Sequence, residues 1–419
     1  MGGTVERLVA AVRDGDADEV RASLEAGADP DTVDGTDGLP VLCRAVAAYD
    51  EPVVEALLEA GADPLRPLPD GTTPLLRAVD GGSHHMVDAL ATHRAPLPAP
   101  VRQELLARAR HWAETDVEAE LRRVTGLTGP VERVRVEDDE VGWWCEQVTL
   151  GGVTVRDEHR AVLTSMEARY GIRTHFDDLA ARALAHPDRG HVVWSEVVFT
   201  LGRRVDEETW QWSRDLLNHP DRSHRLLGAD LLLSLIFGDI VTGRQPFWNR
   251  GRELVPWAEE EQDPEVLAVV LHAMTHDNAP EIEAVGLSHL THPDPAVRAL
   301  IPETLEQSED GRPLVRPESL TAVLTLARDP DPFVREAVCH WLAHHRAGEP
   351  EVGDALAALT HDELQSIRIG AVSGLAWRDD PRCVEAEHRI GPLDKALPFD
   401  ERLLDVSRYQ RRQEASESL

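Results

Sequence analysis

The sequence predicts an all-α protein, a solenoid of helical repeats with a small connector that contains β-structure. Two observations lead to this prediction. Residues 25–30 read EAGADP, and residues 59–64 repeat the same letters at an offset of 34. Short turns built from His, Asp and Pro then recur along the second half of the chain. Apolar residues make up 42% of the 419, mostly Ala, Leu and Val, which suits closely packed helices in a chain too long for one compact core.

The N-terminal repeats keep one register. The pair Ala-Val at positions 11–12 returns at 45–46 and 78–79, at offsets of 34 and 33. A sequence that recurs at such an interval is one structural unit used several times. Gly27 and Gly61 follow the second helix of their repeats, where a residue with positive φ is needed to end a helix. The register therefore predicts pairs of helices joined by loops.

The third copy begins with a helix-start signal, DGTTPL at residues 70–75. Pro74 fits the first helical turn, where its missing N–H costs nothing, and one of the two threonines before it can cap that turn. Together with the period and the EAGADP turns, this start resembles the ankyrin repeat, and the resemblance covers residues 1–100. The first copy lacks the TPL start and the third lacks EAGADP, as degenerate capping repeats do.

The ankyrin resemblance implies that a partner protein meets the loop tips and the inner helices of the repeats. On this chain the positions that the resemblance singles out are Asp34, Asp37, Arg44, Tyr49, Leu68, Asp70 and Arg77. Helically spaced apolar residues at 101–126 extend the predicted ankyrin-like domain to residues 1–126.

Residues 127–173 are predicted to form a connector. The segment VERVRVEDDE alternates apolar and polar residues, and EQVTLGGVTVRD reads as a short hairpin around Gly151-Gly152. A helix is expected to follow at about 157–170 and to end at Gly171. The connector is therefore the one part of the chain where strands are expected.

A second kind of repeat is predicted at residues 174–400. After three of its turns comes a hydrophobic residue followed by an arginine, in the pairs Val297-Arg298, Val334-Arg335 and Ile367-Arg368. We expect the β-branched residue to enter the core and the arginine to reach a carboxylate or a loop carbonyl of the adjacent repeat, while Asp and Pro stop one helix and cap the next. This pattern resembles HEAT repeats, including the short bacterial HEAT-like kind. The charged residues 401–419 are expected to fray.

One insertion, residues 238–253, interrupts the second array. Because aromatic and arginine residues dominate binding hot spots, Phe247 and Trp248 are predicted to form an exposed anchor for a partner. Large aromatic rings otherwise fill gaps between helix layers, so most of the other tryptophans of the array are expected in the core. These are Trp194, Trp210, Trp212, Trp257, Trp341 and Trp377.

No motif for catalysis stands out. The sequence holds no P-loop, GxGxxG, GxSxG or Cys–His signature, so no catalytic residue and no cofactor are predicted. His340 and His344 are four residues apart, as are His272 and His276, and such pairs can chelate zinc from one helix face. No HExxH arrangement and no third ligand accompany them, so no metal site is predicted. Histidines in the His-Pro-Asp turns are interpreted as helix caps.

The formal net charge is −33. A field of this sign repels phosphate backbones and anionic lipid heads, which argues against nucleic acid and membrane surfaces as partners. It favours a protein partner with a basic segment. The four cysteines are far apart, and the N-terminus lacks a long apolar stretch, so a reducing cytoplasm is expected. Lys395 is the only lysine, which indicates a GC-rich bacterial genome.

These features favour a protein-protein interaction scaffold or adaptor that binds through the ankyrin loop tips and the concave face of the HEAT-like array. The HEAT resemblance leaves other classes open. One is an enzyme of the lyase type, or a regulatory subunit of one, acting on a small molecule. Another is a protein that binds damaged DNA, which the acidity disfavours. A third is a structural assembly factor that binds its own copies. The oligomeric state is left open.

Overall fold

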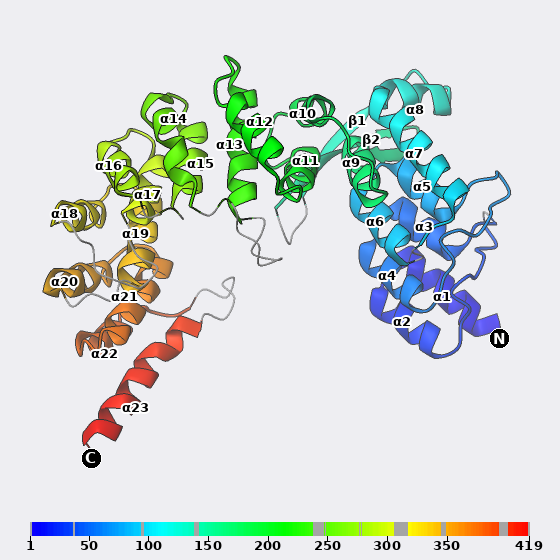
Figure 1. Cartoon of the computed structure of the whole chain (residues 1–419). Coiled ribbons are helices and arrows are strands. Elements are labelled where there is room, and N and C mark those ends of the chain that lie inside the picture. The colour runs from blue at the N-terminus through cyan, green and yellow to red at the C-terminus, as the bar shows by residue number, and fades with distance from the viewer. Residues whose placement is uncertain are drawn as a thin grey trace. The chain divides into compact units, whose positions relative to one another are not determined.

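The structure is a computed structural model of the whole chain. It describes residues 2–36, 38–93, 96–137, 142–237, 247, 249–275, 277, 279–305, 317–344, 349–393 and 401–417. The chain divides into two compact units, Met1–Leu201, the N-terminal unit, and Gly202–Leu419, the C-terminal unit (Figure 1). Each unit has a hydrophobic core of its own.

The N-terminal unit begins with paired helices. They are α1 (Gly2–Asp14), α2 (Ala17–Glu25), α3 (Val41–Ala48), α4 (Glu51–Glu59), α5 (Pro74–Gly81), α6 (His84–His93), α7 (Ala99–Glu114) and α8 (Val117–Thr125). The first helices of the pairs, α1, α3 and α5, stack on one another and on α7, and the second helices α2, α4 and α6 form a second layer. Thr73 caps α5 with its hydroxyl, and Gly27 and Gly61 have φ of 89° and 94°. The predicted helix starts and ends are therefore confirmed.

A small antiparallel sheet follows. Its strands β1 (Glu132–Glu137), β2 (Trp144–Leu150) and β3 (Val153–Arg156) lie in the order β1-β2-β3. Gly151 and Gly152 both have positive φ and form the predicted two-residue turn between β2 and β3. One face of the sheet packs Val148, Leu150 and Val155 against α7 and α8. The hairpin predicted from the sequence is thus confirmed.

Three further helices complete this unit: α9 (His159–Arg169), α10 (Phe176–Leu184) and α11 (Val192–Gly202). Helix α9 packs on α6 and α7 and adds Val162, Leu163 and Met166 to the core of the helical pairs. The residues predicted to connect two arrays therefore build part of the N-terminal unit, because the buried side of α9 closes the end of the stack.

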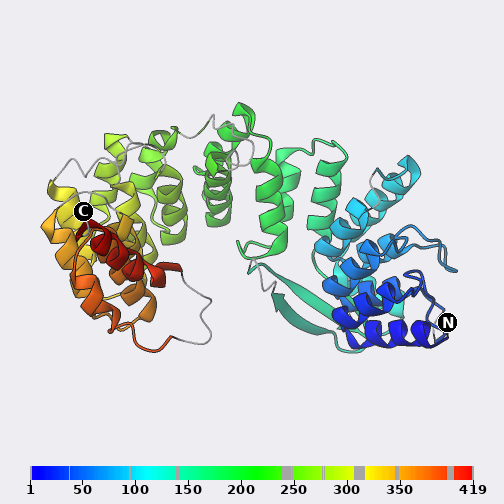
Figure 2. The same ribbon diagram turned by 90° about the horizontal axis from the view of Figure 1, so that it is seen from below.

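The C-terminal unit consists of helices. They are α12 (Glu207–Leu216), α13 (Arg222–Phe237), η1 (Gly251–Leu254), α14 (Val255–Glu260), α15 (Pro264–Met274), α16 (Pro280–Ser288), α17 (Pro295–Thr304), α18 (Pro317–Leu326), α19 (Pro332–His344), α20 (Pro350–Leu359), α21 (Gln365–Trp377), α22 (Arg382–Glu387), η2 (Glu401–Leu404) and α23 (Asp405–Glu417). Helices α13, α15, α17, α19 and α21 pack one on the next in a single row (Figure 2). No described helix is both long and apolar enough to cross a membrane.

One arginine geometry recurs along this row. Each arginine donates from Nη1 to the backbone carbonyls six and five residues before it, which closes its own turn, in Arg225, Arg298, Arg335 and Arg368. Three of them also bind a carboxylate just before the next helix of the row, in the pairs Arg225–Glu261, Arg298–Asp329 and Arg335–Asp362. The preceding residues Val297, Val334 and Ile367 are buried. The expected ladder of arginines is confirmed.

The C-terminal segment differs from its expectation. The residues predicted to fray form α23 within the described part of the chain, and Val406 and Tyr409 of this helix are buried in the core of the unit. Asp405 accepts hydrogen bonds from the Ser373 hydroxyl at 2.6 Å and from Trp377 Nε1 at 2.9 Å. Two apolar residues three positions apart share one helix face, and that face supplies the packing that holds this charged segment.

The tryptophans of the array are partly as expected. Trp194, Trp210 and Trp341 are buried, whereas Trp377 is 65% exposed. Its ring lies at the surface although its N–H is bound by Asp405, as described above. An exposed ring of this kind is therefore held by a hydrogen bond rather than by burial.

Candidate functional site

The first predicted loop residue lies inside its loop. Asp34 has a side chain only 3% exposed, and its carboxylate accepts from Arg13 at 2.6 Å and from Arg44 at 2.9 Å. The hydrogen bond from Arg13, together with the backbone N–H of Thr36, holds the pKa of Asp34 well below its ordinary value. Asp34 is therefore buried and holds its loop in place through these two arginines, and it is not exposed at the loop tip. Asp37 lies outside the described residues.

The second loop presents its charges at the surface. Asp70 and Arg77 form an ion pair of 2.9 Å, and hydrogen bonds from Thr72 lower the pKa of Asp70 to about 2. Leu68 is buried beneath this loop, which differs from its predicted position at an accessible tip. Of the predicted loop residues, Asp70 and Arg77 are therefore the accessible pair.

Tyr49 joins three elements of the N-terminal unit. It ends α3 in the left-handed conformation, with φ of 57°. Its hydroxyl lies 2.7 Å from the carbonyl of Gly81 and 3.2 Å from that of Thr154 in β3. The Arg156 guanidinium lies over its ring, 4.3 Å from the centroid. Burial raises the pKa of Tyr49 well above its ordinary value, so the phenol stays neutral.

A cavity of about 870 Å³ opens beside Tyr49. We call it the Tyr49 cavity. Aromatic, apolar and sulfur-containing side chains line it, including Tyr49, Met86, Val136, Trp143, Trp144, Cys145 and Val192. Five carboxylates also line it, those of Asp50, Glu51, Glu55, Glu137 and Glu158, against the single guanidinium of Arg156. The cavity therefore combines aromatic rings with an excess of negative charge, which is the combination that attracts an organic cation.

The more buried polar groups of the cavity are paired or neutral. Glu158 lies 3.8 Å from Arg156 and accepts the backbone N–H of His84 at 2.7 Å, at the start of α6. Burial raises the pKa of Cys145 far above its ordinary value, so its thiol is protonated at neutral pH. Arg156 is offset by Glu158, and Glu137 is paired with Arg135 at 2.8 Å. Among the described residues, the uncompensated charge of the cavity therefore belongs to Asp50, Glu51 and Glu55.

The acidic surface continues along two helices. A shallower hollow of about 450 Å³ between α4 and α6 shares Glu51, Glu55 and His85 with the Tyr49 cavity and adds Glu59 and Asp88. Glu51, Glu55 and Glu59 are four residues apart, so they follow one face of α4. A long basic chain can therefore meet carboxylates both in the cavity and along α4.

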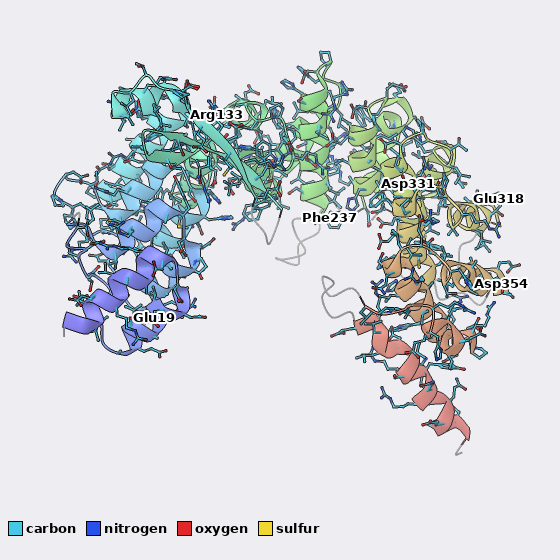
Figure 3. The ribbon with its side chains drawn as sticks, turned by 180° about the vertical axis from the view of Figure 1, so that it is seen from behind. Glu19, Arg133, Phe237, Glu318, Asp331 and Asp354 are labelled. Atoms are coloured by element: carbon cyan, nitrogen blue, oxygen red, sulfur yellow. The ribbon has the colours of Figure 1, made fainter. Side chains whose placement is uncertain are left out.

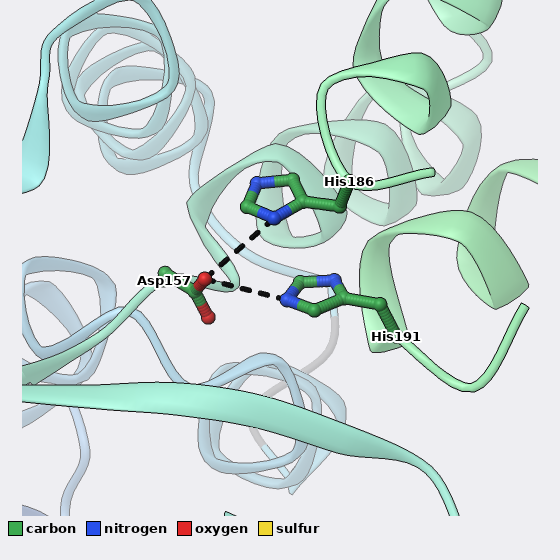
Figure 4. Close-up of side chains that lie close together, drawn as sticks. All are labelled: Asp157, His186 and His191. Atoms are coloured by element: carbon green, nitrogen blue, oxygen red, sulfur yellow. Dashed lines mark hydrogen bonds and ion pairs between the residues drawn. The ribbon is translucent and has the colours of Figure 1, made fainter. Parts of the chain in front are cut away.

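A separate cluster brings one carboxylate and two imidazoles together (Figure 4). Asp157 follows β3, and His186 and His191 lie in the turn between α10 and α11. The Oδ2 atom of Asp157 lies 3.6 Å from His186 Nδ1 and 3.3 Å from His191 Nε2, and the two rings stack with centroids 4.1 Å apart. These are ligand types that zinc takes.

The hydrogen bonds of this cluster oppose a metal ion. Nδ1 of His191 accepts the N–H of Val193 at 3.2 Å, which leaves the proton of a neutral ring on Nε2, facing Asp157. Coordination through Nε2 would move that proton to Nδ1, against the N–H of Val193. His186 faces Arg160 with Nε2 at 3.5 Å and so presents Nδ1–H to Asp157. The cluster therefore joins the turn between α10 and α11 to Asp157 by hydrogen bonds, and only His191 in it is fully buried.

The second cluster of this type caps a helix. His219 accepts the N–H of Asp221 through Nδ1, and the Asp221 carboxylate accepts the N–H of His224 at the start of α13. His292 likewise accepts the N–H of Asp294 through Nδ1 at 3.1 Å, and Asp294 in turn accepts the N–H of Ala296 in the first turn of α17. At both turns the aspartate accepts the N–H groups of the helix, whereas the histidine ring binds the N–H of that aspartate and holds the turn. The interpretation of these histidines as helix caps is therefore wrong at these two turns.

The histidine pairs predicted from spacing show local contacts. His344 Nδ1 lies 2.8 Å from the backbone oxygen of His340, so that nitrogen donates within its own helix. His272 packs edge-on against Phe237, and His276 lies outside the described residues.

The insertion in the C-terminal unit presents a different picture from the prediction. Phe247 is 4% exposed and stacks on Trp210 with ring centroids 4.9 Å apart, and Arg250 lies over the Trp210 ring at 4.4 Å. The expectation that Phe247 is exposed is wrong, because the indole ring of Trp210 stacks on it and covers it. Trp248 lies outside the described residues.

Comparison with known families identifies the first helical pairs. Residues 8–98 match the family model for ankyrin repeats, in three copies. This stretch is three ankyrin repeats. The resemblance seen in the sequence is thereby confirmed, and ankyrin repeats are general modules for binding proteins. The Tyr49 cavity lies against the second and third ankyrin repeats, because α3, α4, and the start of α6 contribute to it.

Two solved structures resemble the chain at low identity. The X-ray structure of the Escherichia coli protein YibA is 14% identical, with a TM-score of 0.43, over 60% of this chain and 95% of that chain. The crystal structure of an engineered protein is also 14% identical, with a TM-score of 0.42, over 98% of this chain and 99% of that chain. A comparison with curated proteins gives no match. The HEAT resemblance of the second array stays a prediction.

Sequence reasoning named Tyr49 but missed the acidic side chains beside it. Glu51 and Glu55 stand one helical turn apart on α4, whereas the positions 34 residues earlier hold Ala17 and Arg21. The acidic pair in one ankyrin repeat, at positions that the preceding repeat fills differently, was the available signal.

Proposed function

We propose that this protein is a protein-protein interaction adaptor and that the Tyr49 cavity receives a basic segment of the partner protein. The observation that carries the proposal is the lining of the cavity, in which carboxylates surround aromatic rings next to two ankyrin repeats. A lysine or arginine side chain fits such a lining because its charge meets carboxylates and its aliphatic stem meets apolar surface.

The charge of the whole chain supports a basic partner. With −33 over 419 residues, the protein attracts cations from a distance and raises the rate at which a basic segment reaches the cavity. Within the cavity a cation over an aromatic ring contributes about 0.5–2 kcal/mol, depending on its desolvation. Both effects favour the same class of partner.

Other surfaces extend the proposed interface. The exposed pair Asp70 and Arg77 presents the second ankyrin loop, and we assign it, with Arg44, a secondary role in partner contact. We also propose that the row of helices in the C-terminal unit is of the HEAT-like type, on the strength of its repeated arginine ladder, and that it offers a further protein-binding surface.

Peptide selection against the full chain tests the proposal. Peptides displayed on phage and selected on the purified protein should be enriched in lysine or arginine. The double variant Glu51→Gln/Glu55→Gln should weaken a selected peptide at least about fivefold in fluorescence anisotropy, because it removes two carboxylates from the cavity mouth.

A matched variant controls for total charge. Glu25→Gln/Glu104→Gln removes the same charge from exposed positions on α2 and α7, away from the cavity, and should leave the affinity nearly unchanged. An equal loss in both double variants would mean that the peptide responds to overall charge, and the cavity would then not be the site. Selection of acidic peptides would contradict the proposal directly.

A further inference from the structure

The sheet of the N-terminal unit has one open edge. Strand β1 pairs with β2 along its whole length, and no described residue pairs with its other side. Five of its six residues are exposed, and Val136 is partly buried. Figure 3 labels Arg133 on this strand. An exposed strand with a free edge is a template for another extended chain, unless something covers it.

The direction of the backbone groups follows from the β2–β3 hairpin. Leu150 and Val153 close a two-residue turn, so they form a hydrogen-bonded pair and the main chain of Leu150 faces β3. Along β2 this direction alternates, and the hydrogen bond from the N–H of Asp157 to the carbonyl of Glu146 agrees with it. Cys145, Gln147 and Thr149 therefore face β1.

The free groups of β1 are then assigned. Glu132, Val134 and Val136 stand opposite Thr149, Gln147 and Cys145, so they make the ladder with β2. By alternation, the N–H and C=O groups of the remaining residues point outward, away from β2. These are Arg133, Arg135 and Glu137, and no hydrogen bond of these backbone groups to a described residue is present.

The side chains of β1 divide between two environments. Val136 lines the Tyr49 cavity beside its pairing partner Cys145, and Val134 shares that face of the strand. On the other face, Arg133 pairs with Glu146 at 2.8 Å and Arg135 lies over the Trp144 ring at 4.4 Å. Glu137 shares the face of these arginines and pairs with Arg135 at 2.8 Å. One face of the strand therefore carries Val134 and Val136 beside an acidic cavity, and the other carries charges that are already paired.

We propose that the basic segment of the partner binds as an extended strand added to the open edge of β1. This inference rests on the proposed function and specifies how the partner is held. The main chain of the segment bonds to the outward groups of Arg133, Arg135 and Glu137. Its alternate side chains point toward the Tyr49 cavity and the carboxylates of Glu51 and Glu55.

The two faces dictate a pattern in the bound segment. Lysine or arginine belongs at every second position, directed to the cavity. Neutral residues belong at the positions that face Arg133 and Arg135, because Glu146 and Glu137 already pair with these arginines. A shift of one residue would reverse these contacts. A second copy of the chain fits the edge less well, because each copy brings a charge of −33.

Variants of Arg135 test the strand addition in the full-length chain. Arg135→Pro removes one outward N–H without removing a bond between β1 and β2, and edge strands tolerate proline. Arg135→Ala also removes the guanidinium side chain but keeps the backbone N–H. The probe is a fluorescent peptide of alternating lysine and threonine. Arg135→Pro should weaken it at least about tenfold relative to Arg135→Ala, with melting temperatures of the two variants alike.

The peptide supplies a second measurement that does not depend on how the variant folds. N-methylation of the threonines and, separately, of the lysines removes the N–H groups of alternate residues. Only one of the two peptides should lose binding to the unmodified chain, because a strand offers one edge to its neighbour. A peptide of the same composition with the lysines in one block should bind at least about fivefold less tightly.

The outcomes separate the two proposals. Equal binding by both N-methylated peptides, or by Arg135→Pro and Arg135→Ala, would overturn strand addition. If Glu51→Gln/Glu55→Gln still lowered the affinity for the peptide, the proposed function would stand without strand addition. If that variant bound the peptide normally, the proposed function would fail as well. A dimer in light scattering that Arg135→Pro dissolves and Arg135→Ala keeps would assign the edge to a second copy and overturn the inference.

Discussion

At the scale of residues, several polar side chains of the N-terminal unit are buried and help to hold its helices together. His159 stacks on Trp112 with centroids 4.5 Å apart and lies 3.2 Å from the carbonyl of Asp80 through Nε2. His84 begins α6 and is largely buried. Burial lowers the pKa of His159 and of His84 to about 4. Both rings are therefore neutral in the folded protein at neutral pH.

These two histidines predict a loss of stability in mild acid. In the unfolded chain a histidine takes up a proton near pH 6.5, whereas His159 and His84 take one up near pH 4 when folded. The unfolded state thus binds more protons between these values, so the N-terminal unit should be fully stable above pH 6.5 and lose stability as the pH falls toward 4. Each histidine contributes on the order of 3 kcal/mol over the whole window.

Hydrogen exchange of α6 and α9 checks this prediction, with rates corrected for the intrinsic effect of pH. Lowering the pH from about 7 to about 5 should increase exchange in these helices. His159→Phe should reduce the difference between the two pH values, whatever its effect on absolute stability. The matched variant His175→Phe, at an exposed position, should keep the difference. An unchanged difference in His159→Phe would contradict the assignment.

At the scale of elements, the C-terminal unit is held by one contact used repeatedly. Arg335 is only 13% exposed and binds Asp362, which is 6% exposed, at 2.7 Å, while its Nη1 closes its own turn. A guanidinium can make all of these bonds because its five N–H groups are held in a plane. Each arginine therefore joins a turn to the next helix of the row.

Substitution of a ladder arginine should destabilise the unit. Arg335→Lys keeps the charge but loses the forked geometry, so Asp362 is left partly unsatisfied, and the free energy of unfolding should fall by about 2–3 kcal/mol. Arg389→Lys is the matched control, since the Arg389–Glu385 pair is 32% and 82% exposed and should change by less than about 1 kcal/mol. Urea denaturation of the full chain measures both. Equal effects would show that burial does not strengthen the ladder.

At the scale of the whole molecule, charge governs which partners can approach. The chain carries 76 acidic residues against 43 basic ones. Much of the basic set is paired internally, as in the arginine ladder and the Asp34 loop. The field outside the protein is therefore negative, which favours the basic segment that we propose for the Tyr49 cavity.

This charge predicts opposite behaviour toward two probes. A short duplex DNA should remain unbound even at about 50 mM salt, where basic proteins bind it tightly. The selected basic peptide should bind under the same conditions and weaken at least about tenfold when the salt is raised to about 500 mM. Fluorescence anisotropy measures both. Binding of DNA at low salt would revive the DNA-binding alternative, and a peptide affinity independent of salt would contradict the role given to the carboxylates.

Much of the fold could be predicted because its signals are local. The EAGADP turn and the Thr-Pro start each lie within one repeat. The first marks the end of a helix and the second marks a start, and both depend on the residues nearest to them. The Val-Arg pairs likewise predicted both the burial of the valine and the ion pair of the arginine. Errors arose where a side chain depended on distant neighbours. Phe247 needed the ring of Trp210, and the helix at 405–417 needed a surface on which to pack.

The sequence by itself determined the ankyrin repeats, the hairpin at Gly151-Gly152 and the negative charge, because periodicity, turn chemistry and composition are properties of the chain before it folds. Only the tertiary structure decided what Tyr49 does. It brings this side chain to the carbonyl of Thr154, 105 residues away, and sets Glu51 and Glu55 beside Val136 at an open strand edge. Such a cavity exists only when distant segments pack together. The acidic pair on α4 could therefore indicate carboxylates in the second repeat, but not the cavity that they border.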